Sequence, residues 1–241
     1  MSTKSLKMFY LLLPFLFLSS CIGFVENGIS GNGNVVTEMK EVGSFHGIEA
    51  SSGLNVFVEF GEMSNQVEVI ADENLHEYIE VEVDNGILEI KSKKSIRRAS
   101  SKDIFVKAGK LDLIEVSSAA DFKGENLLLA EDIEIEVSSA GDLDLELDAN
   151  LVRVEVSSSG SASLKGKAFK LIADVSSAGD LKAFDLVVEE ADVDASSAAN
   201  AKVHATKKIR ADASSAGNIH YQGNPAERNT SSSSAGNVSG R

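Results

Sequence analysis

The stretch IEIEVSSAGDLDLEL, residues 133–147, contains the unit from which most of the chain is built. Its central phrase, S-S-A-G-D or a close variant, occurs seven times at a nearly constant step along the chain. A fixed period of about 20 residues is typical of stacked units that cannot bury their apolar faces alone. The sequence therefore predicts a solenoid. The copies begin at Ser117, Ser138, Ser157, Ser176, Ser196, Ser214 and Ser233.

Apolar and acidic residues alternate on both sides of the phrase, as in Ile133-Glu134-Ile135 before it and Leu143-Asp144-Leu145 after it. Strict alternation predicts strands with one face buried and the other carrying carboxylates into water. Between the strands, glycine accepts a positive φ and Asp or Asn can bond to its own backbone, so this pair predicts a sharp bend. We expect the bends at Gly141, Asp142, Gly179, Asp180, Asn200, Gly217, Asn218, Gly236 and Asn237, with Ser161 replacing the acid in one copy.

Stacking of these units at about 4.8 Å predicts an all-β protein, a parallel β-solenoid (β-helix) with turns of about 19 residues. Small Ser, Ala and Gly side chains suit the inside of a tight corner, and an aromatic content of 6% with no Trp suits a thin aliphatic interior. Leucine-rich repeats need a helical segment, propeller blades are about twice as long, and an antiparallel sandwich does not need an identical phrase. We expect about ten turns, which makes a rod about 50 Å long.

Residues 1–20 have the features of a lipoprotein signal peptide rather than of folded structure. Lys4 and Lys7 precede an apolar run from Met8 to Leu18, which is too short to span a bilayer. The run ends in L-S-S-C, which resembles the lipobox of bacterial lipoproteins and implies cleavage before Cys21 and lipidation of that residue. Cys21 is the only cysteine, so no intramolecular disulfide can form.

The rest of the chain divides into a tether and a repeat domain, according to how regular the repeat is. Residues 21–42 carry the lipidated N-terminus and, being rich in glycine, predict a flexible tether. Residues 43–241 predict a single solenoid domain, with irregular opening turns over 43–116 and regular S-S-A-G-D/N repeats over 117–241. Asp84-Asn85-Gly86, between two apolar runs, predicts a β-hairpin. Solenoid ends need covering, and the last phrase leaves no obvious cap, so we expect copies to pair end to end near Ser233 to Val238.

A resemblance to a known family is carried by three segments before the repeats: Phe45 to Val56, V-E-V-I-A-D-E-N-L at 67–75, and D-N-G-I-L-E-I at 84–90. With the serial S-S-A-G-D phrases, they resemble the "putative auto-transporter adhesin, head GIN domain" family of Bacteroidetes lipoproteins, over about residues 34–241. The resemblance implies a right-handed parallel β-helix on the cell envelope. It brings no catalytic residues to this chain.

Charge excludes one class of partner. The formal charge is −14, and it becomes −16 once the signal with Lys4 and Lys7 is removed. Nucleic acid and anionic lipid surfaces repel such a chain. The outward acids are best interpreted as residues that keep long β-faces soluble and discourage edge pairing. Lys91, Lys93, Lys94, Arg97 and Arg98 form the one basic cluster, which we expect on a solvated loop, with contact to phosphate headgroups or lipopolysaccharide as the alternative.

Catalytic and metal chemistry are weakly supported. The turn acids Asp121, Asp142 and Asp180 could bind calcium, but nonapeptide β-rolls need a period of nine. Pairs such as Asp142 with Asp144, or Asp180 with Asp185, could cleave a polysaccharide, yet they recur on repeating positions as surface decoration does. The serines are too many to single out a nucleophile. The histidines share no repeat position and no metal-ligand spacing; they are His46, His76, His204 and His220.

We therefore expect a non-enzymatic protein without cofactor, catalytic residues or metal. It is lipid-anchored in the bacterial cell envelope, at the outer membrane, and acts as an adhesin or binding scaffold. Its partners are a glycan or a surface protein, contacted along repeated Ser, Asp and Asn positions. A periplasm-facing scaffold or stress-signalling partner is the first alternative. A carbohydrate-active β-helix enzyme is the second.

Overall fold

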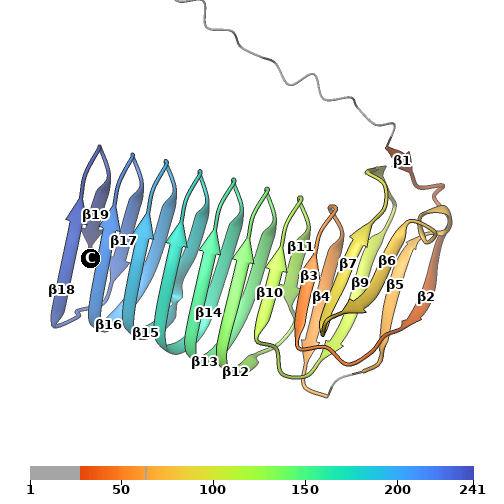
Figure 1. Cartoon of the computed structure of the whole chain (residues 1–241), viewed down its shortest axis with the longest axis horizontal. Coiled ribbons are helices and arrows are strands. Elements are labelled where there is room, and N and C mark those ends of the chain that lie inside the picture. Colours follow the sequence, from red (N-terminus) through yellow and green to blue (C-terminus); the bar gives the residue numbers. More distant parts are fainter. Residues whose placement is uncertain (1–27, 63) are drawn as a thin grey trace, which may run out of the picture.

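The computed structural model describes residues 28–62 and 64–241, and its strands stack into a parallel β-solenoid of about seven turns (Figure 1). The predicted all-β class and the spacing of about 19 residues are confirmed. The predicted signal peptide, residues 1–20, and Cys21 lie outside the described residues. Within the described part, the 3-10 segment η1 (Glu73–Leu75) is the only helical element, and no helix is long and apolar enough to cross a membrane.

Seventeen strands form one continuous sheet that winds along the molecule, and β1 pairs with β8 in a separate two-stranded sheet. The strands are β1 (Ile29–Ser30), β2 (Val35–Glu41), β3 (Gly47–Ala50), β4 (Asn55–Phe60), β5 (Gln66–Asp72), β6 (Ile79–Asp84), β7 (Ile87–Ser92), β8 (Ile96–Arg98), β9 (Lys102–Ala108), β10 (Leu113–Val116), β11 (Asp121–Gly124), β12 (Leu128–Val137), β13 (Asp142–Val156), β14 (Ser161–Val175), β15 (Asp180–Ala195), β16 (Asn200–Ala213), β17 (Asn218–Gln222), β18 (Glu227–Ser232) and β19 (Asn237–Gly240).

In the regular part, a single long strand makes most of each turn. β13 leaves one corner, bends at the far end of the coil and returns to the next corner (Figure 1). Its side chains are buried alternately up to Ala149, then Asn150 and Leu151 both turn outward, and alternation resumes at Val152. This one-residue slip keeps apolar side chains inside both arms of the bent strand, because successive side chains of a strand point to opposite faces.

The interior consists of aliphatic columns one coil apart. Leu143 lies in register with Ala162 on the next coil, and Ala162 with Leu181, so large and small side chains alternate along the column. All three are fully buried. Each fully buried Leu stabilises the fold by about 1.5–3 kcal/mol. The alternation of large and small side chains lets neighbouring coils approach to the spacing of hydrogen-bonded strands, about 4.8 Å.

One coil is out of sequence order. β3 and β4 lie between the coil of β7 and β9 and the coil of β10 and β11. Ser51-Ser52-Gly53 joins β3 to β4, with positive φ at Ser52 and Gly53, and this corner stacks below the one that begins at Ser117. An eighth corner of the same kind thus precedes the seven recognised from the repeat.

The N-terminal end of the solenoid is covered by antiparallel strands, which changes two expectations from the sequence. β2 pairs with β5, and β5 with β9, so residues 28–42 belong to the folded cap and are not a flexible tether. Fewer turns form than the ten expected, because residues 64–86 and 93–101 build the cap instead of coils. β6 and β7 are an antiparallel pair whose two-residue loop, Asn85 and Gly86, has φ of 49° and 84°, as a type I′ loop requires.

Asp72 holds the cap together from inside. Its carboxylate is fully buried and accepts hydrogen bonds from the backbone N–H groups of Gly33, Ser100 and Ser101. Burial by itself raises the pKa of Asp72, but these hydrogen bonds outweigh it and hold the pKa below its usual value. One ionised side chain thereby fixes two loops that are far apart in the sequence.

Candidate binding surfaces

The repeated phrase forms a tight turn at one corner of every coil. In the second copy, the Gly141 N–H donates to the Ser138 carbonyl oxygen at 2.8 Å, and Ser139 and Ala140 have φ of 50° and 61°. Two central residues with positive φ are the pattern of a type I′ turn. The Ala140 N–H donates to the Ser158 carbonyl oxygen of the next coil at 3.1 Å, so the strained turn is held by the stack itself.

The glycine of the phrase is needed for space, which corrects the expectation that it takes the positive φ. The positive φ falls on the two preceding residues, whose side chains lie at the exposed tip, whereas Gly141 and Gly179 are buried. A Cβ at Gly141 would lie 2.7 Å from the Val116 carbonyl oxygen of the neighbouring coil, and one at Gly179 would lie 2.5 Å from that of Val156. Close approach between coils therefore selects glycine here.

A column of polar side chains follows directly after this corner. Asp142 lies in register with Asp121 on one side and Ser161 on the other, and the pairing continues through every coil. Amide and carboxylate groups bond along the column in places, as Asn55 does to Asp103 at 2.7 Å. The column runs Asp103, Asn55, Asp121, Asp142, Ser161, Asp180, Asn200, Asn218 and Asn237.

A second column, on the strands that enter the corners, consists of carboxylates only. Neighbours in a parallel ladder are about 4.8 Å apart, so these charges repel one another. Partial burial, and after it the charges of Glu136, Glu49 and Glu134, raise the pKa of Glu115. The acidic column runs Glu89, Glu49, Glu115, Glu136, Glu155, Asp174, Asp194 and Asp212. Our sequence reasoning missed it, although seven of its members precede an S-S pair by two residues.

Arg210 neutralises the C-terminal end of this acidic column. Its guanidinium donates to Asp192 at 2.5 Å and to Asp194 at 3.2 Å, and it also contacts Asp212. The hydrogen bonds to Asp192 and Asp194 raise the pKa of Arg210 above its usual value. The remaining column therefore keeps its strongest uncompensated charge around Glu115 and Glu136.

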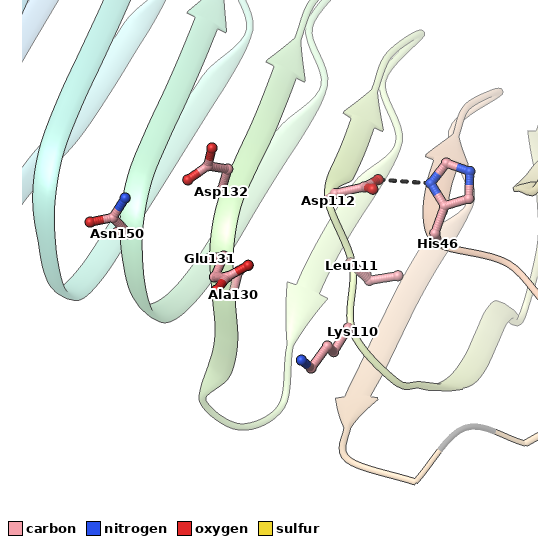
Figure 2. Close-up of a pocket in the computed structure, with 8 residues that line it drawn as sticks. All are labelled: His46, Lys110, Leu111, Asp112, Ala130, Glu131, Asp132 and Asn150. Carbon is pink, nitrogen blue, oxygen red and sulfur yellow. Dashed lines mark hydrogen bonds and ion pairs between the residues drawn. The ribbon is translucent and has the colours of Figure 1, made fainter.

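A surface groove of about 690 Å³ lies where the segments that lead into β3 and β10 run beside β12 and β13. Figure 2 shows the side chains that line it. The His46 Nδ1 lies 2.8 Å from an Asp112 oxygen, and Lys110, Glu131, Asp132 and Asn150 complete the polar lining. The other ring nitrogen packs on the β6–β7 loop, since a Cβ at Gly86 would lie 2.7 Å from Nε2. Because none of the eight lining residues is Ser, Thr or Cys, the groove offers contacts to a ligand but no hydroxyl or thiol nucleophile.

The other three histidines lie outside this groove, and His204 and His220 are on neighbouring strands, two register positions apart. His76 is buried in the cap, where its Nε2 lies 3.3 Å from the Val36 carbonyl oxygen and its Nδ1 lies 3.4 Å from Glu38 without a hydrogen bond. His204 contacts Gln222, and His220 contacts Ser239 at 2.6 Å. Among the described residues, no three His, Asp, Glu or Cys side chains come together as a metal site.

The basic cluster is partly neutralised by the hairpin. Lys91 contacts Glu89 and Glu82, Lys93 lies 2.7 Å from Glu80, and the Lys94 ammonium lies 4.4 Å from the centre of the Tyr78 ring. Lys91 is itself in β7 and not in a loop. Headgroup binding would have to compete with these contacts.

The carboxylate pairs considered for polysaccharide cleavage lie on the outward face of the coils. Asp144 accepts from Lys165 at 2.9 Å, and Asp180 lies 3.5 Å from Lys182. Asp185 is in register with Lys165. Each of these three acids therefore lies beside a lysine on a ladder face, which is the arrangement of surface ion pairs.

Comparisons with known proteins agree on one group. The profile of the family described as "Putative auto-transporter adhesin, head GIN domain" matches residues 44–225. Among known structures, a putative adhesin from Bacteroides fragilis NCTC 9343 has a TM-score of 0.82 at 21% identity, over 89% of this chain and 100% of that chain. A putative lipid binding protein from Parabacteroides distasonis ATCC 8503 has a TM-score of 0.72 at 22% identity, over 88% and 99%.

A third structure, a putative adhesin from Parabacteroides merdae ATCC 43184, has a TM-score of 0.69 at 21% identity, over 88% and 98% of the two chains. At these identities, the structural likeness shows a shared fold. No curated protein matches the sequence.

Proposed function

Because the chain belongs to the family described as "putative auto-transporter adhesin, head GIN domain", we propose that it is a non-enzymatic adhesin, anchored by a lipid on Cys21 to the outer membrane of a bacterial cell. The single observation that carries the binding role is the polar column beside the corners. It places one short hydrogen-bonding side chain on every coil, in register, from Asp103 to Asn237.

Such a column suits shallow, multivalent binding. A glycan or surface protein with its own repeat can contact several coils at once, and each further contact forms at a high effective concentration. Single contacts of this kind are weak, because each exchanges protein–water for protein–ligand hydrogen bonds. A long face of equal weak contacts therefore fits adhesion better than tight capture of a small molecule.

The lipid anchor is supported by the L-S-S-C motif at residues 18–21. Replacement Cys21→Ser is expected to move the protein from the membrane fraction to the soluble periplasmic fraction. A chain that stays with the membrane after this replacement would remove the anchor from the proposal.

Surface exposure is tested by treating intact cells with protease and probing for residues 200–241 with an antibody. Loss of the epitope from unbroken cells supports the adhesin. Protection that ends only on lysis places the solenoid in the periplasm and refutes adhesion to outside partners.

The polar column is tested with a triple variant in which Asp121, Asp142 and Asp180 become alanine, which removes the hydrogen-bonding group from three coils. Because none of these three side chains is part of the buried core, the fold should persist. We expect cell adherence to a glycan- or matrix-coated surface to fall several-fold. Glu146→Gln on the same strand face is the matched control, and equal loss in both would count against the column.

A further inference from the structure

A groove of about 600 Å³ lies on the outward face where the cap joins the first coils. β2, β5, β9 and β4 are neighbours there, so residues from 39 to 107 meet on one surface. One side of the groove is apolar and the other is polar, and both sides run across the strands.

The apolar side is built around two phenylalanines. Phe57 and Phe105 are register partners, and their rings are stacked with centroids 5.0 Å apart and an interplanar angle of 17°. Phe105 is also in register with Glu68 of β5, which pairs with Met39 of β2. Phe105 remains 39% exposed and Met39 53% exposed, although most large apolar side chains of the described residues are buried.

The polar side lies two residues further along each strand. Lys107 and Glu59 are register partners, 3.4 Å apart, and Gln66 lines the groove beside them. Glu125, at the far end, pairs with Lys123 at 2.8 Å. Two of the three carboxylates that line the groove thus have a lysine partner, and only Glu68 has none among the described residues.

This distribution of charge selects the occupant. An anionic headgroup or uronic acid meets no free cation, since Lys107 is already paired. A strongly cationic ligand meets a single unpaired carboxylate, Glu68, and gains little from Glu59 and Glu125, which are already paired with lysines. A hydrocarbon chain would strip water from Glu59, Lys107 and Gln66 without replacing their hydrogen bonds, which is costly. A neutral ligand with one apolar face and a rim of hydroxyls satisfies both sides.

We infer that this groove, the aromatic groove, binds a neutral pyranose chain. The C–H face of a sugar ring packs on the negative ring faces and apolar edges of Phe57, Phe105 and Met39. Its hydroxyls donate to the Glu59 and Glu68 carboxylates and accept from Lys107 and Gln66. The inference rests on the proposed adhesin function for its biological setting, and it names the chemistry and the place of one glycan subsite.

The test uses the full chain with Cys21→Ser and saturation-transfer NMR. The probes are the neutral hexasaccharides cellohexaose, xylohexaose and chitohexaose, with hexagalacturonate, phosphatidylglycerol vesicles and polylysine for comparison. We expect saturation transfer to at least one neutral hexasaccharide and none to the anionic or cationic probes. Binding only to vesicles, only to hexagalacturonate or only to polylysine, or to none of the six, overturns the inference.

The site itself is tested by Phe105→Ala, which should weaken hexasaccharide binding at least tenfold. The matched control is Phe169→Ala, because Phe169 is 47% exposed but lies on β14, away from the groove. A melting curve for each variant shows whether the fold is retained, and Glu59→Gln, which spares the rings, provides a second variant. Equal affinity of Phe105→Ala and Phe169→Ala refutes the assignment.

Failure of this inference and failure of the proposed function have different results. If purified Phe105→Ala binds hexasaccharide as well as Phe169→Ala does, while the polar-column variant loses cell adherence, the groove assignment fails and the adhesin stands. If protease never reaches the solenoid on intact cells, the adhesin fails, and the NMR measurement on the purified chain still decides the groove.

Discussion

Replacing the corner glycine Gly179 with alanine should destabilise the solenoid, although its φ is not positive. The new Cβ would lie 2.5 Å from the Val156 carbonyl oxygen and 2.9 Å from the carbonyl carbon, in the neighbouring coil. That oxygen already accepts from the Ser176 N–H at 2.9 Å. Relief of the clash therefore requires the two coils to separate at a place where a ladder hydrogen bond holds them.

Two natural corners already have alanine, Ala120 and Ala199, in place of this glycine, and their turn hydrogen bonds show its effect. The turn hydrogen bond is 2.8 Å at Gly141 and Gly179 and 2.7 Å at Gly217, but 3.0 Å at Ala120 and 3.1 Å at Ala199. Overpacking typically costs about 1–3 kcal/mol and a weakened hydrogen bond about 0.5–1.5 kcal/mol. The lower entropy of the unfolded alanine chain returns about 0.4–1 kcal/mol. We expect a net loss of about 1–3 kcal/mol.

A loss of this size lowers the melting temperature by about 3–10 °C for a domain of about 200 residues. Thermal unfolding followed by far-UV circular dichroism measures it. Ala178→Gly is the matched control, because Ala178 has φ of 61° and glycine relieves its strain. It should leave the melting temperature unchanged or raise it. If Gly179→Ala melts like the wild type, or if Ala178→Gly is the more harmful change, the reasoning about coil contact is refuted.

Three further changes test the electrostatics. Asp72→Asn should lower the melting temperature at pH 7. Because the pKa of Asp72 is lowered in the folded state, the stability that its carboxylate contributes is present above the unfolded pKa and is lost as the pH falls through the folded pKa. The difference in melting temperature between wild type and variant should therefore narrow toward pH 2, and a constant difference would contradict this. Glu136→Gln should stabilise the folded protein by about 0.3 kcal/mol at pH 7, since burial and the charges of Glu155 and Glu134 raise the pKa of Glu136 and penalise its ionised form. The gain should vanish below the unfolded pKa. Destabilisation at pH 7 would argue against repulsion among the carboxylates of the acidic column. Arg210→Gln should lower the free energy of unfolding, measured by urea titration, by about 1 kcal/mol at low salt and by less in 1 M NaCl. Arg153, which is related to Arg210 through the register partners Ile172 and Asp192, has no ion pair within the described residues, so Arg153→Gln should change little in the same titration.

The regular coils were predictable from the sequence because their neighbours are one period apart. Leu143 meets Ala162, the equivalent position of the next repeat, so periodicity along the chain is also contact in space. The alternation around the S-S phrase determined which side chains enter the core. The sequence did not show which corner residues carry positive φ, because that depends on how closely the carbonyl of Val116, in the preceding coil, approaches Gly141.

The cap and the surfaces built on it were decided by tertiary structure. Ile48 pairs with Leu88 on one side and Ile114 on the other. Ile48 and Ile114 each precede an S-S pair by three residues, but no repeat in the sequence places Leu88 beside them. The insertion of β3 and β4 between later strands brings Phe57 beside Phe105 and Glu49 into the acidic column. Local patterning of apolar residues determines that a segment is a strand and which face it buries. Which distant strand it pairs with depends on competition among many equally polar backbone edges, and only the assembled fold resolves that competition.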